Sequence, residues 1–378
     1  MVSAAIGPLV LFATQFFMYL ALSLTLNLEF GITGIPNFGK VLFVAAGGML
    51  GASATYRLAL FAFNLRSNDI FESSPLFVAS KINPGLANNP FLAAELFVFA
   101  VVFGALVAGA LGYLSSYPAI RLREDYLGML LLGAGELFAV LTAFYPPIVG
   151  GPENLTSPDL LTGFGNNESL AMMVILGVFA LGVFLYAQRV AKSPLGRTLR
   201  AVRENEVASE ALGKDNINIR RKMLVISSAL AGAIGALWTI YWAQIGGLIG
   251  GDVGSTFPRL FFTFYPFVIV ILGGAANNYG VLVGSFLLTG LQTITTESLP
   301  ALVTNVKIPG FGVNLLDDVL NSTQYIIVGL LLLVVVLWRP EGLLREKPSY
   351  AIPKSKLKAM ASKILGDSDS KKKSPGSG

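Results

Sequence analysis

The feature that most constrains this chain is a succession of apolar segments, most of them close to the ~20 residues that a helix needs to cross a bilayer. Hydrophobic residues make up 54% of the 378 residues and charged residues only 13%, whereas soluble domains are about 25% charged. A chain of this length could form several soluble domains, but one bundle of membrane spans explains the apolar composition more simply. The sequence therefore predicts an all-α, polytopic membrane helix bundle.

We expect about nine spans, within a range of eight to ten, over residues 1–345. Glycine interrupts several of them, so some are expected to be broken or re-entrant. The expected spans cover residues 9–28, 38–60, 91–115, 126–145, 170–188, 223–242, 260–272, 279–291 and 324–338. The remaining residues, 346–378, are rich in Lys and are predicted to form a disordered cytosolic tail.

A polar segment, residues 193–222, interrupts the apolar runs and is here named the polar island. With Arg189 and Lys192 it holds nine basic residues against four acidic ones. Basic loops beside spans stay in the cytoplasm, which predicts an outside N-terminus and a cytoplasmic C-terminus in the cell membrane. With that threading, 22 of the 27 basic residues lie on the cytoplasmic side.

The polar island itself carries the signature of a surface helix. Ser193 and Pro194 suit a helix start and Gly213 a helix end, so we predict about 20 residues of helix between them. Its small apolar stripe and charged rim suit insertion into a groove of another protein. The alternative is a helix that lies on the membrane with its Arg side chains near lipid phosphates.

Composition also excludes several kinds of chemistry. The chain contains no Cys and no His, which removes thiolate nucleophiles, disulfides and His metal ligands. It contains no GxxxxGK[ST] phosphate loop either. We therefore expect a non-enzyme that holds no cofactor or metal, binds no nucleic acid, and takes energy from partner subunits.

Four motifs carry a resemblance to a known family. The island reads SPLGRTLRAVRENEVASEALG, residues 31–52 read GITGIPNFGKVLFVAAGGMLGA, residues 120–141 read IRLREDYLGMLLLGAGELFAVL, and residues 329–344 read GLLLLVVVLWRPEGLL. In this order they resemble the LivM-type permease subunits of branched-chain amino-acid ABC transporters, over roughly residues 20–344. The chain departs from the family pattern at Lys40, where many relatives have His.

The resemblance implies partners and a coupling element. The partners are a homologous second permease subunit of the LivH type, two ABC ATPase subunits, an extracytoplasmic substrate-binding protein and the lipid bilayer. Within the island, Glu210, Ala211, Leu212 and Gly213 match the Glu-Ala-x-Gly element that meets the ATPase. The expected coupling residues are Arg200, Arg203, Glu204, Glu206, Glu210, Ala211 and Gly213.

The translocation path is expected where glycine-interrupted helices meet, because unwound backbone can hold a zwitterion. The candidate residues are Gly34, Asn37, Gly39, Gly133 and Glu136. A carboxylate inside a span costs about 2.5–3.5 kcal/mol, so Glu136 should shape the path or bind a neighbouring helix; an interhelical bond of purely structural use is the alternative. For Lys40 we predict a side chain that snorkels to the cytoplasmic interface.

Three functional classes remain in view. The primary hypothesis is a permease subunit of a binding-protein-dependent ABC importer for Leu, Ile or Val. Within the same family, the alternative cargo is urea or short amides. A stand-alone secondary transporter or channel would need more intramembrane carboxylates than Glu136 supplies, and an intramembrane enzyme or assembly scaffold lacks catalytic side chains.

Overall fold

The computed structural model describes residues 2–65, 77–122, 124–149, 155–244, 248–249 and 256–295, with short stretches between 326 and 346. About half of the expected span 324–338 and nearly all of the tail lie outside these described residues. The chain divides into two compact units, Met1–Arg345 and Glu346–Gly378. In chain order the elements of the first unit are α1 (Val2–Leu26), η1 (Asn27–Thr33), α2 (Lys40–Ala62), η2 (Val78–Ile82), α4 (Asn83–Asn88), α5 (Pro90–Arg121), α6 (Glu124–Phe144), α7 (Pro146–Val149), β1 (Leu155–Thr156), η4 (Thr162–Asn167), α8 (Glu168–Lys192), α9 (Pro194–Glu204), α10 (Glu206–Ala211), α11 (Asn216–Gln244), β2 (Leu248–Ile249), η5 (Leu260–Phe264), α13 (Tyr265–Gly273) and α14 (Asn278–Thr293).

The polytopic helical fold is confirmed. Among the described residues, six helices are long and apolar enough to cross a membrane, and they correspond to the first six expected spans. Expected spans seven and eight form a helix pair, Leu260–Gly273 and Asn278–Thr293, bent by 120° at a short break. The six spans are Gly7–Thr33, Lys40–Ala62, Pro90–Pro118, Tyr126–Phe144, Glu168–Lys192 and Asn216–Trp242. The total of nine spans therefore stays a prediction.

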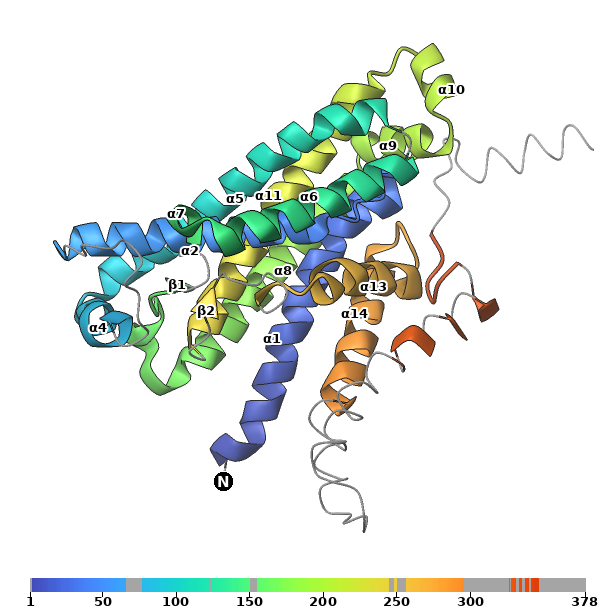
Figure 1. The fold of residues 1–378 in the computed structure, drawn as a ribbon. Coiled ribbons are helices and arrows are strands. Elements are labelled where there is room, and N and C mark those ends of the chain that lie inside the picture. Colours follow the sequence, from blue (N-terminus) through green and yellow to red (C-terminus); the bar gives the residue numbers. More distant parts are fainter. Residues whose placement is uncertain are drawn as a thin grey trace, which may run out of the picture. The chain divides into compact units, whose positions relative to one another are not determined.

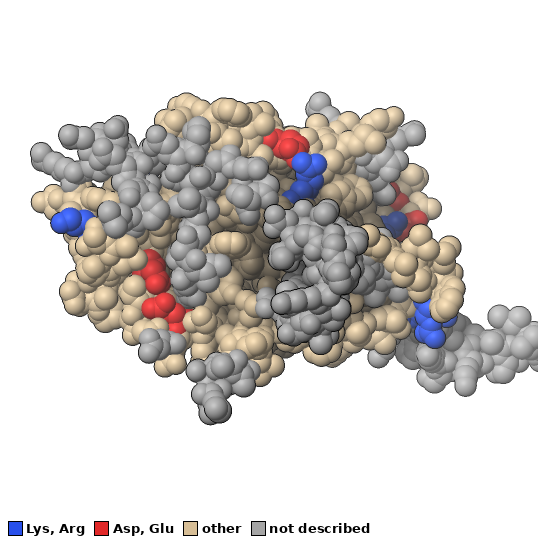
Figure 2. All heavy atoms as spheres, turned by 60° about the horizontal axis from the view of Figure 1, so that its bottom comes forward, with Lys and Arg blue, Asp and Glu red and all other residues tan. Residues whose placement is uncertain are grey.

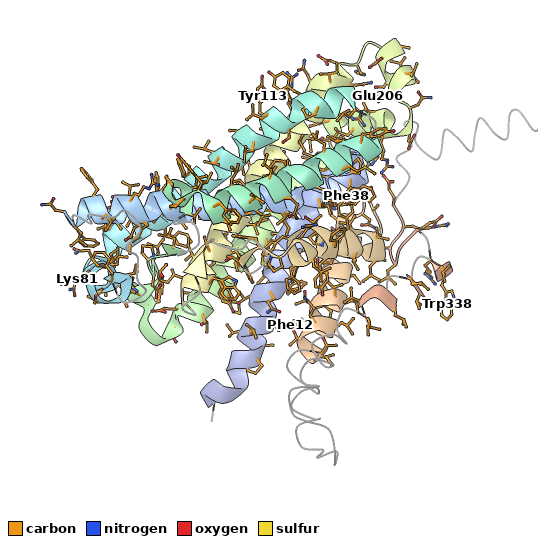
Figure 3. All side chains as sticks on the ribbon, in the orientation of Figure 1. Phe12, Phe38, Lys81, Tyr113, Glu206 and Trp338 are labelled. Atoms are coloured by element: carbon orange, nitrogen blue, oxygen red, sulfur yellow. The ribbon has the colours of Figure 1, made fainter. Side chains whose placement is uncertain are left out.

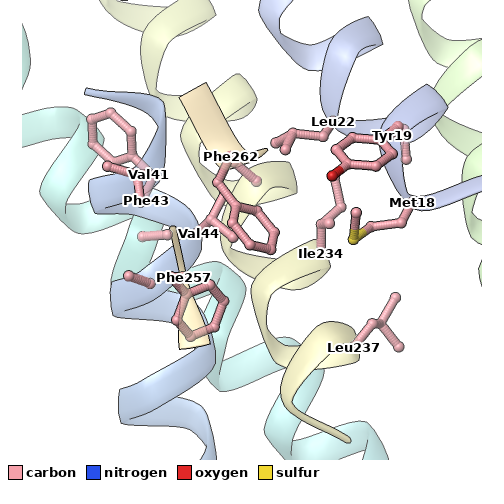
Figure 4. Packing of buried hydrophobic residues seen from close by; sticks show 14 of the residues in the cluster. Met18, Tyr19, Leu22, Val41, Phe43, Val44, Ile234, Leu237, Phe257 and Phe262 are labelled. Atoms are coloured by element: carbon pink, nitrogen blue, oxygen red, sulfur yellow. The ribbon is translucent and has the colours of Figure 1, made fainter. Parts of the chain in front are cut away.

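Helices α2, α5 and α11 form the most tightly packed part of the bundle (Figure 1). Glycine permits this packing, because a Cβ added to Gly47 of α2 would lie 2.3 Å from Cα of Gly232 on α11. Small residues allow helix backbones to approach in this way where lipid offers no hydrophobic driving force. Around the contact, bulky side chains from α1, α2, α11 and η5 interdigitate, among them Leu22, Phe43, Ile234 and Phe262 (Figure 4).

The ends of the bundle carry different short elements. Helices α9 and α10 lie at one end, where Glu206 is labelled, and α4 lies at the other, near Lys81 (Figures 1 and 3). At the α4 end, β1 and β2 form a two-stranded antiparallel pair in which Leu155 faces Ile249. The described part of the face in Figure 2 is mostly uncharged, with a few isolated acidic and basic side chains. Such a surface suits a lipid environment.

The turn between α13 and α14 is joined to the end of the first unit. The backbone amides of Leu343 and Leu344 donate to the carbonyl oxygens of Leu272 and Gly273, each at 2.9 Å. Gly274 in the turn has a φ of +111°, and a Cβ there would lie 2.2 Å from the carbonyl oxygen of Leu344. The close approach therefore requires glycine, and the motif RPEGLL ends against this turn.

Candidate translocation and coupling site

The site begins where the first span breaks. Helix α1 continues into the seven-residue π-helical segment η1, which ends at Gly34 with a φ of +79°. Pro36 has no backbone N–H, and a left-handed residue cannot continue a right-handed helix, so the chain does not become helical again until Lys40. We call residues 34–39 the break.

A buried ion pair spans the break. The ammonium of Lys40 lies 3.0 Å from Oε2 of Glu29, and both side chains are fully buried. The amide of Asn37 donates to the same carboxylate oxygen at 3.0 Å. On the other side, Lys40 contacts the hydroxyl of Ser227 on α11 at 3.1 Å, and that hydroxyl donates to the carbonyl of Thr25. The charges are thus neutralised within the protein, as burial in a membrane requires.

The position of Lys40 corrects the expectation from sequence. We predicted that its side chain snorkels to the cytoplasmic interface, and this is wrong, because Lys40 has no exposed surface. The physical reason is Glu29, which offers an opposite charge eleven residues earlier, across the break. Pairing inside the bundle replaces the water that snorkelling would have reached.

Gly39 also belongs to the break, and it lies against α6. A Cβ on Gly39 would be 2.5 Å from the carbonyl oxygen of Leu131. The amide of Gly39 donates to the side-chain oxygen of Asn37 at 3.1 Å, which fixes the turn into α2. The structure thus brings Gly34, Asn37 and Gly39 together, as three of the five expected path residues.

Gly133 and Glu136 lie elsewhere, on the exposed face of α6. A Cβ on Gly133 would meet nothing within 4 Å. Glu136 forms an ion pair with Arg259, the residue before η5, and their side chains are 49% and 43% exposed. Glu136 thus lies outside the break and pairs with a neighbouring segment, which fits both a bond that serves transport and one of purely structural use.

A buried amide network lies on the other side of η1. The side chain of Asn27 donates to Asn278 at 2.9 Å and accepts from the backbone amide of Ala276 at 2.8 Å. Asn278 in turn donates to Gln188 of α8 at 3.1 Å. These bonds join η1 to the turn of the bent pair and to α8. Segment η1 is therefore bonded to its neighbours through the charged Glu29 and through the neutral Asn27.

An apolar cavity of about 690 Å³ opens beside the break. It is lined chiefly by aromatic and aliphatic side chains of η1, the break, α13 and its neighbours, including Phe30, Phe38, Phe267, Val268 and Ile271. Phe38 and Phe267 stack with ring centroids 4.7 Å apart. The volume lies within the range of small-molecule sites.

The polar island forms two helices where one was predicted. Ser193 caps α9, accepting from the amide of Gly196 at 3.2 Å. Asn205 is extended, and its side chain caps α10 by accepting from the amide of Ala208 at 3.0 Å. The prediction of one continuous helix is therefore wrong, because Asn at this position satisfies the first turn of a new helix better than it extends the old one. Gly213, with a φ of +74°, follows the end of α10.

The seven expected coupling residues divide into two groups. Arg200 donates to the carbonyl of Ala191 at 3.1 Å, Arg203 donates to the carbonyl of Gly31, and Glu206 pairs with Arg220 at 3.0 Å. These three are therefore bonded to their own chain. The other four are exposed: Glu204, Glu210, Ala211 and Gly213.

An exposed apolar surface accompanies the second group. Val207 and Leu212 are 76% and 79% exposed, whereas Leu199 and Val202 on α9 are buried against the bundle. At the start of α11, Asp215 accepts from the backbone amide of Asn218 at 3.0 Å, and this bond lowers the pKa of the Asp215 carboxyl. The island is thus capped and anchored through α9, while α10 presents a free face.

Sequence reasoning missed Glu29, Ser227 and the amide network. Glu29 left a signal, because Glu29 and Lys40 are the only Asp, Glu, Lys or Arg residues among the first 56. Two opposite charges inside apolar sequence are expected to pair. Asn27 and Asn278 left no such signal, since 251 positions separate them and neutral amides are common at helix ends.

Comparisons with known proteins identify the family of the chain. Residues 9–336 match the family model described as branched-chain amino acid transport system / permease component. The chain is 32% identical to a probable branched-chain amino acid transport permease protein LivM of Methanocaldococcus jannaschii, over 90% of this chain and 94% of that protein. It is 25% identical to a high-affinity LivM permease protein of Salmonella typhimurium, over 88% of this chain and 69% of the relative. No solved structure matches the chain. With its spans, its break and a match over most of its length, the chain belongs to the family of permease components of branched-chain amino acid transport systems.

Proposed function

We propose that this chain is a translocating subunit of a binding-protein-dependent ABC importer that carries Leu, Ile or Val across the cell membrane. ATP is hydrolysed by two partner ATPases, and a homologous second permease and an extracytoplasmic binding protein complete the complex. The observation that carries the proposal is the free face of α10, with Val207 and Leu212 exposed, on an island anchored to a broken span. A multi-pass protein with such a face on its most basic loop suits docking of a cytosolic partner.

The cavity beside the break favours an aliphatic cargo over urea. Its lining side chains are apolar, and its volume of about 690 Å³ exceeds what one amino-acid side chain needs. Burial of a Leu, Ile or Val side chain there is stabilised by roughly 1.5–3 kcal/mol. Urea has only polar groups, which this lining does not bind. We therefore assign the cavity to the aliphatic part of the cargo and the break to its charged part.

The translocation step is assigned to the break. A zwitterion carries both an ammonium and a carboxylate, and Glu29 and Lys40 are a carboxylate and an ammonium held 3.0 Å apart. In the structure these side chains neutralise each other. Separation of η1 from α2 would expose both charges, together with the amide of Asn37, to the cargo.

Uptake by the reconstituted complex tests the cargo. The chain is placed in proteoliposomes with its second permease, ATPases and binding protein, and labelled leucine and urea are supplied with ATP. We expect ATP-dependent uptake of leucine that unlabelled isoleucine and valine reduce. Urea uptake without leucine uptake would contradict the cargo, and leucine uptake by this chain alone under an ion gradient would contradict the ABC mechanism.

Association with the ATPase tests the free face of α10. Glu210→Lys reverses an exposed charge and Gly213→Trp places a bulky side chain at a φ of +74°. Both variants are expected to reduce ATPase co-purification and leucine uptake by about tenfold or more, the factor that corresponds to ~1.4 kcal/mol of binding. Lys81→Glu, at the opposite end of the bundle, serves as the charge-reversal control (Figure 3). Undiminished association and uptake by both island variants would rule out this docking face.

A further inference from the structure

Helix α9 is attached directly to the π-helical segment η1. The guanidinium of Arg203 donates through Nη1 to the carbonyl oxygen of Gly31 in η1. The aliphatic part of the same side chain covers Gly34, where an added Cβ would lie 2.8 Å from Cγ of Arg203. One residue of the cytosolic island thus contacts both η1 and the first residue of the break.

The carbonyl of Gly31 is available because of the local sequence. In a π-helix this carbonyl would accept from the amide five residues later, and that residue is Pro36, which has no N–H. The α-helical alternative, the amide of Ile35, donates instead to the carbonyl of Glu29 at 2.9 Å. A carbonyl without a backbone donor and away from water needs another partner, and Arg203 supplies a charged one.

The segment held by Arg203 carries both buried networks of the site. Glu29, two residues before Gly31, forms the ion pair with Lys40 across the break. Asn27, four residues before Gly31, is bonded to the turn between α13 and α14. A displacement of α9 that drags the Gly31 carbonyl would therefore pull on both networks at once.

We propose that Arg203 is a positioning residue that couples the cytosolic island to the break, so that α9 and η1 move together when the ATPases close. The proposal rests on the proposed function. It assigns the two groups of island residues different tasks: the exposed face of α10 receives the ATPase, and the inward Arg203 transmits its motion to Glu29. The Glu29–Lys40 pair then separates because η1 moves while α2, packed on α5 and α11, stays in place.

Substitution separates transmission from docking. Arg203→Met keeps the aliphatic stem over Gly34 and removes the hydrogen-bond donors. In the reconstituted complex, we expect this variant to leave ATPase co-purification at the wild-type level. Leucine uptake should fall by about tenfold or more, because one charge-assisted hydrogen bond contributes at least that factor. The stimulation of ATP hydrolysis by the loaded binding protein should disappear. Arg203→Lys retains a donor and is expected to be intermediate. Arg197→Met is the matched control, because Arg197 is exposed on the same helix.

A reversible covalent link supplies the second measurement. A Cβ on Gly34 would lie 3.4 Å from Cβ of Arg203, close to the roughly 3.5–4.5 Å separation found in disulfides. The chain has no native cysteine, so any disulfide in the double variant Gly34→Cys/Arg203→Cys joins the two introduced residues. We expect the reduced form to be uncoupled and the oxidised form to recover uptake and stimulated hydrolysis. Gly34→Cys alone controls for strain at a φ of +79°.

The outcomes are distinguishable. Normal coupling in Arg203→Met overturns the inference, as does a double variant that forms no disulfide or that stays uncoupled after the disulfide forms. Loss of ATPase association in Arg203→Met also overturns it, because Arg203 would then be a docking residue. These comparisons are made against an active wild-type complex, whose own failure to import any aliphatic amino acid would instead overturn the proposed function.

Discussion

Glu29 and Lys40 differ from the other charges of the site because both side chains are fully buried. They pair with each other across the break, and Asn37 and Ser227 supply further hydrogen bonds to the pair. Lys40 begins α2 and Glu29 lies within η1, so the pair closes the gap that the break opens. Burial of such an ion pair costs folding free energy. Removal of one partner costs more, because the remaining charge has no water to solvate it.

Removal of one member of the pair should therefore be worse than removal of both. Lys40→Met leaves the Glu29 carboxylate unpaired and is expected to destabilise the chain by about 3–5 kcal/mol. The double variant Glu29→Gln/Lys40→Met leaves no charge and should recover most of that loss, while leucine uptake stays low. Thermal unfolding in detergent, followed by tryptophan fluorescence, measures the first effect. Equal stability of single and double variants would contradict the pairing, and normal uptake by the double variant would contradict its role in translocation.

Some of the site residues could be predicted from the sequence and others could not. Gly34, Asn37 and Gly39 were predicted as one group because Gly and Pro interrupt helices wherever they cluster. Glu136 was singled out because it lies in the middle of an apolar run, whereas Glu29 follows the end of one and was missed. Position within a run does not reveal which carboxylate has a partner. The partner of Glu29 is Lys40, and the place of Lys40 depends also on Ser227 of α11, which is 187 positions away in the sequence.

Among the elements, α10 depends on a single cap. Asn205→Ala removes the side-chain oxygen that accepts from Ala208 and is expected to cost about 1 kcal/mol of local stability. Hydrogen exchange of the α10 amides should become faster by about fivefold, and ATPase association should weaken in proportion. Asn205→Asp retains the cap and serves as control. Unchanged exchange in Asn205→Ala would show that the helix does not need the cap.

The cavity beside α13 gives a second test at this scale. Ile271→Trp fills part of the space without adding charge, so it is expected to lower the apparent affinity for leucine with little effect on ATPase association. Val178→Trp, on the exposed face of α8, adds the same bulk away from the cavity and should leave uptake unchanged. Uptake at increasing leucine concentrations distinguishes the two variants. An equal effect of both would exclude the cavity as the cargo site.

Element types were easier to predict than element ends. Runs of apolar residues longer than 18 gave six spans correctly, because length alone nearly determines a transmembrane helix. The runs 260–272 and 279–291 are too short for that argument, and their relation depends on the turn at Gly274 and on its contact with Leu344. The interruption at Asn205 was missed for a similar reason, since no Gly or Pro lies between α9 and α10 and the helix end is marked only by the extended Asn205 and its capping bond to Ala208.

For the whole molecule, we expect the proposed second permease to pack on the exposed face of α6. Glu136 lies in the middle of α6 and pairs with Arg259, yet nearly half of each side chain is uncovered. A charge exposed to lipid at that depth costs about 2.5–3.5 kcal/mol. Apart from Glu136, the exposed face of α6 also carries apolar side chains such as Met129 and Leu137, and the middle of the exposed face of α8 carries Val174, Val178 and Leu181 without a charge. We therefore expect α6 to face protein and α8 to face lipid.

A photo-cross-linking residue placed at Gly133 tests that arrangement. Gly133 is exposed on α6 with open space around it, and Val178 offers an equivalent position on α8. In the assembled complex, irradiation should give an adduct with the second permease from position 133 and none from position 178. The reverse pattern would place the partner on α8. Glu136→Leu should not lower the stability of the isolated chain, but it should reduce co-purification of the second permease.

The bend between α13 and α14 also bears on how many times the chain crosses the membrane. The two helices are bent by 120° relative to each other. A pair that inserts as a hairpin adds an even number of crossings, two if it reaches the far leaflet and none if it stops midway, whereas a pair that forms one broken span adds a single crossing. For the hairpin, the side on which every later segment lies is therefore independent of how deeply the pair inserts.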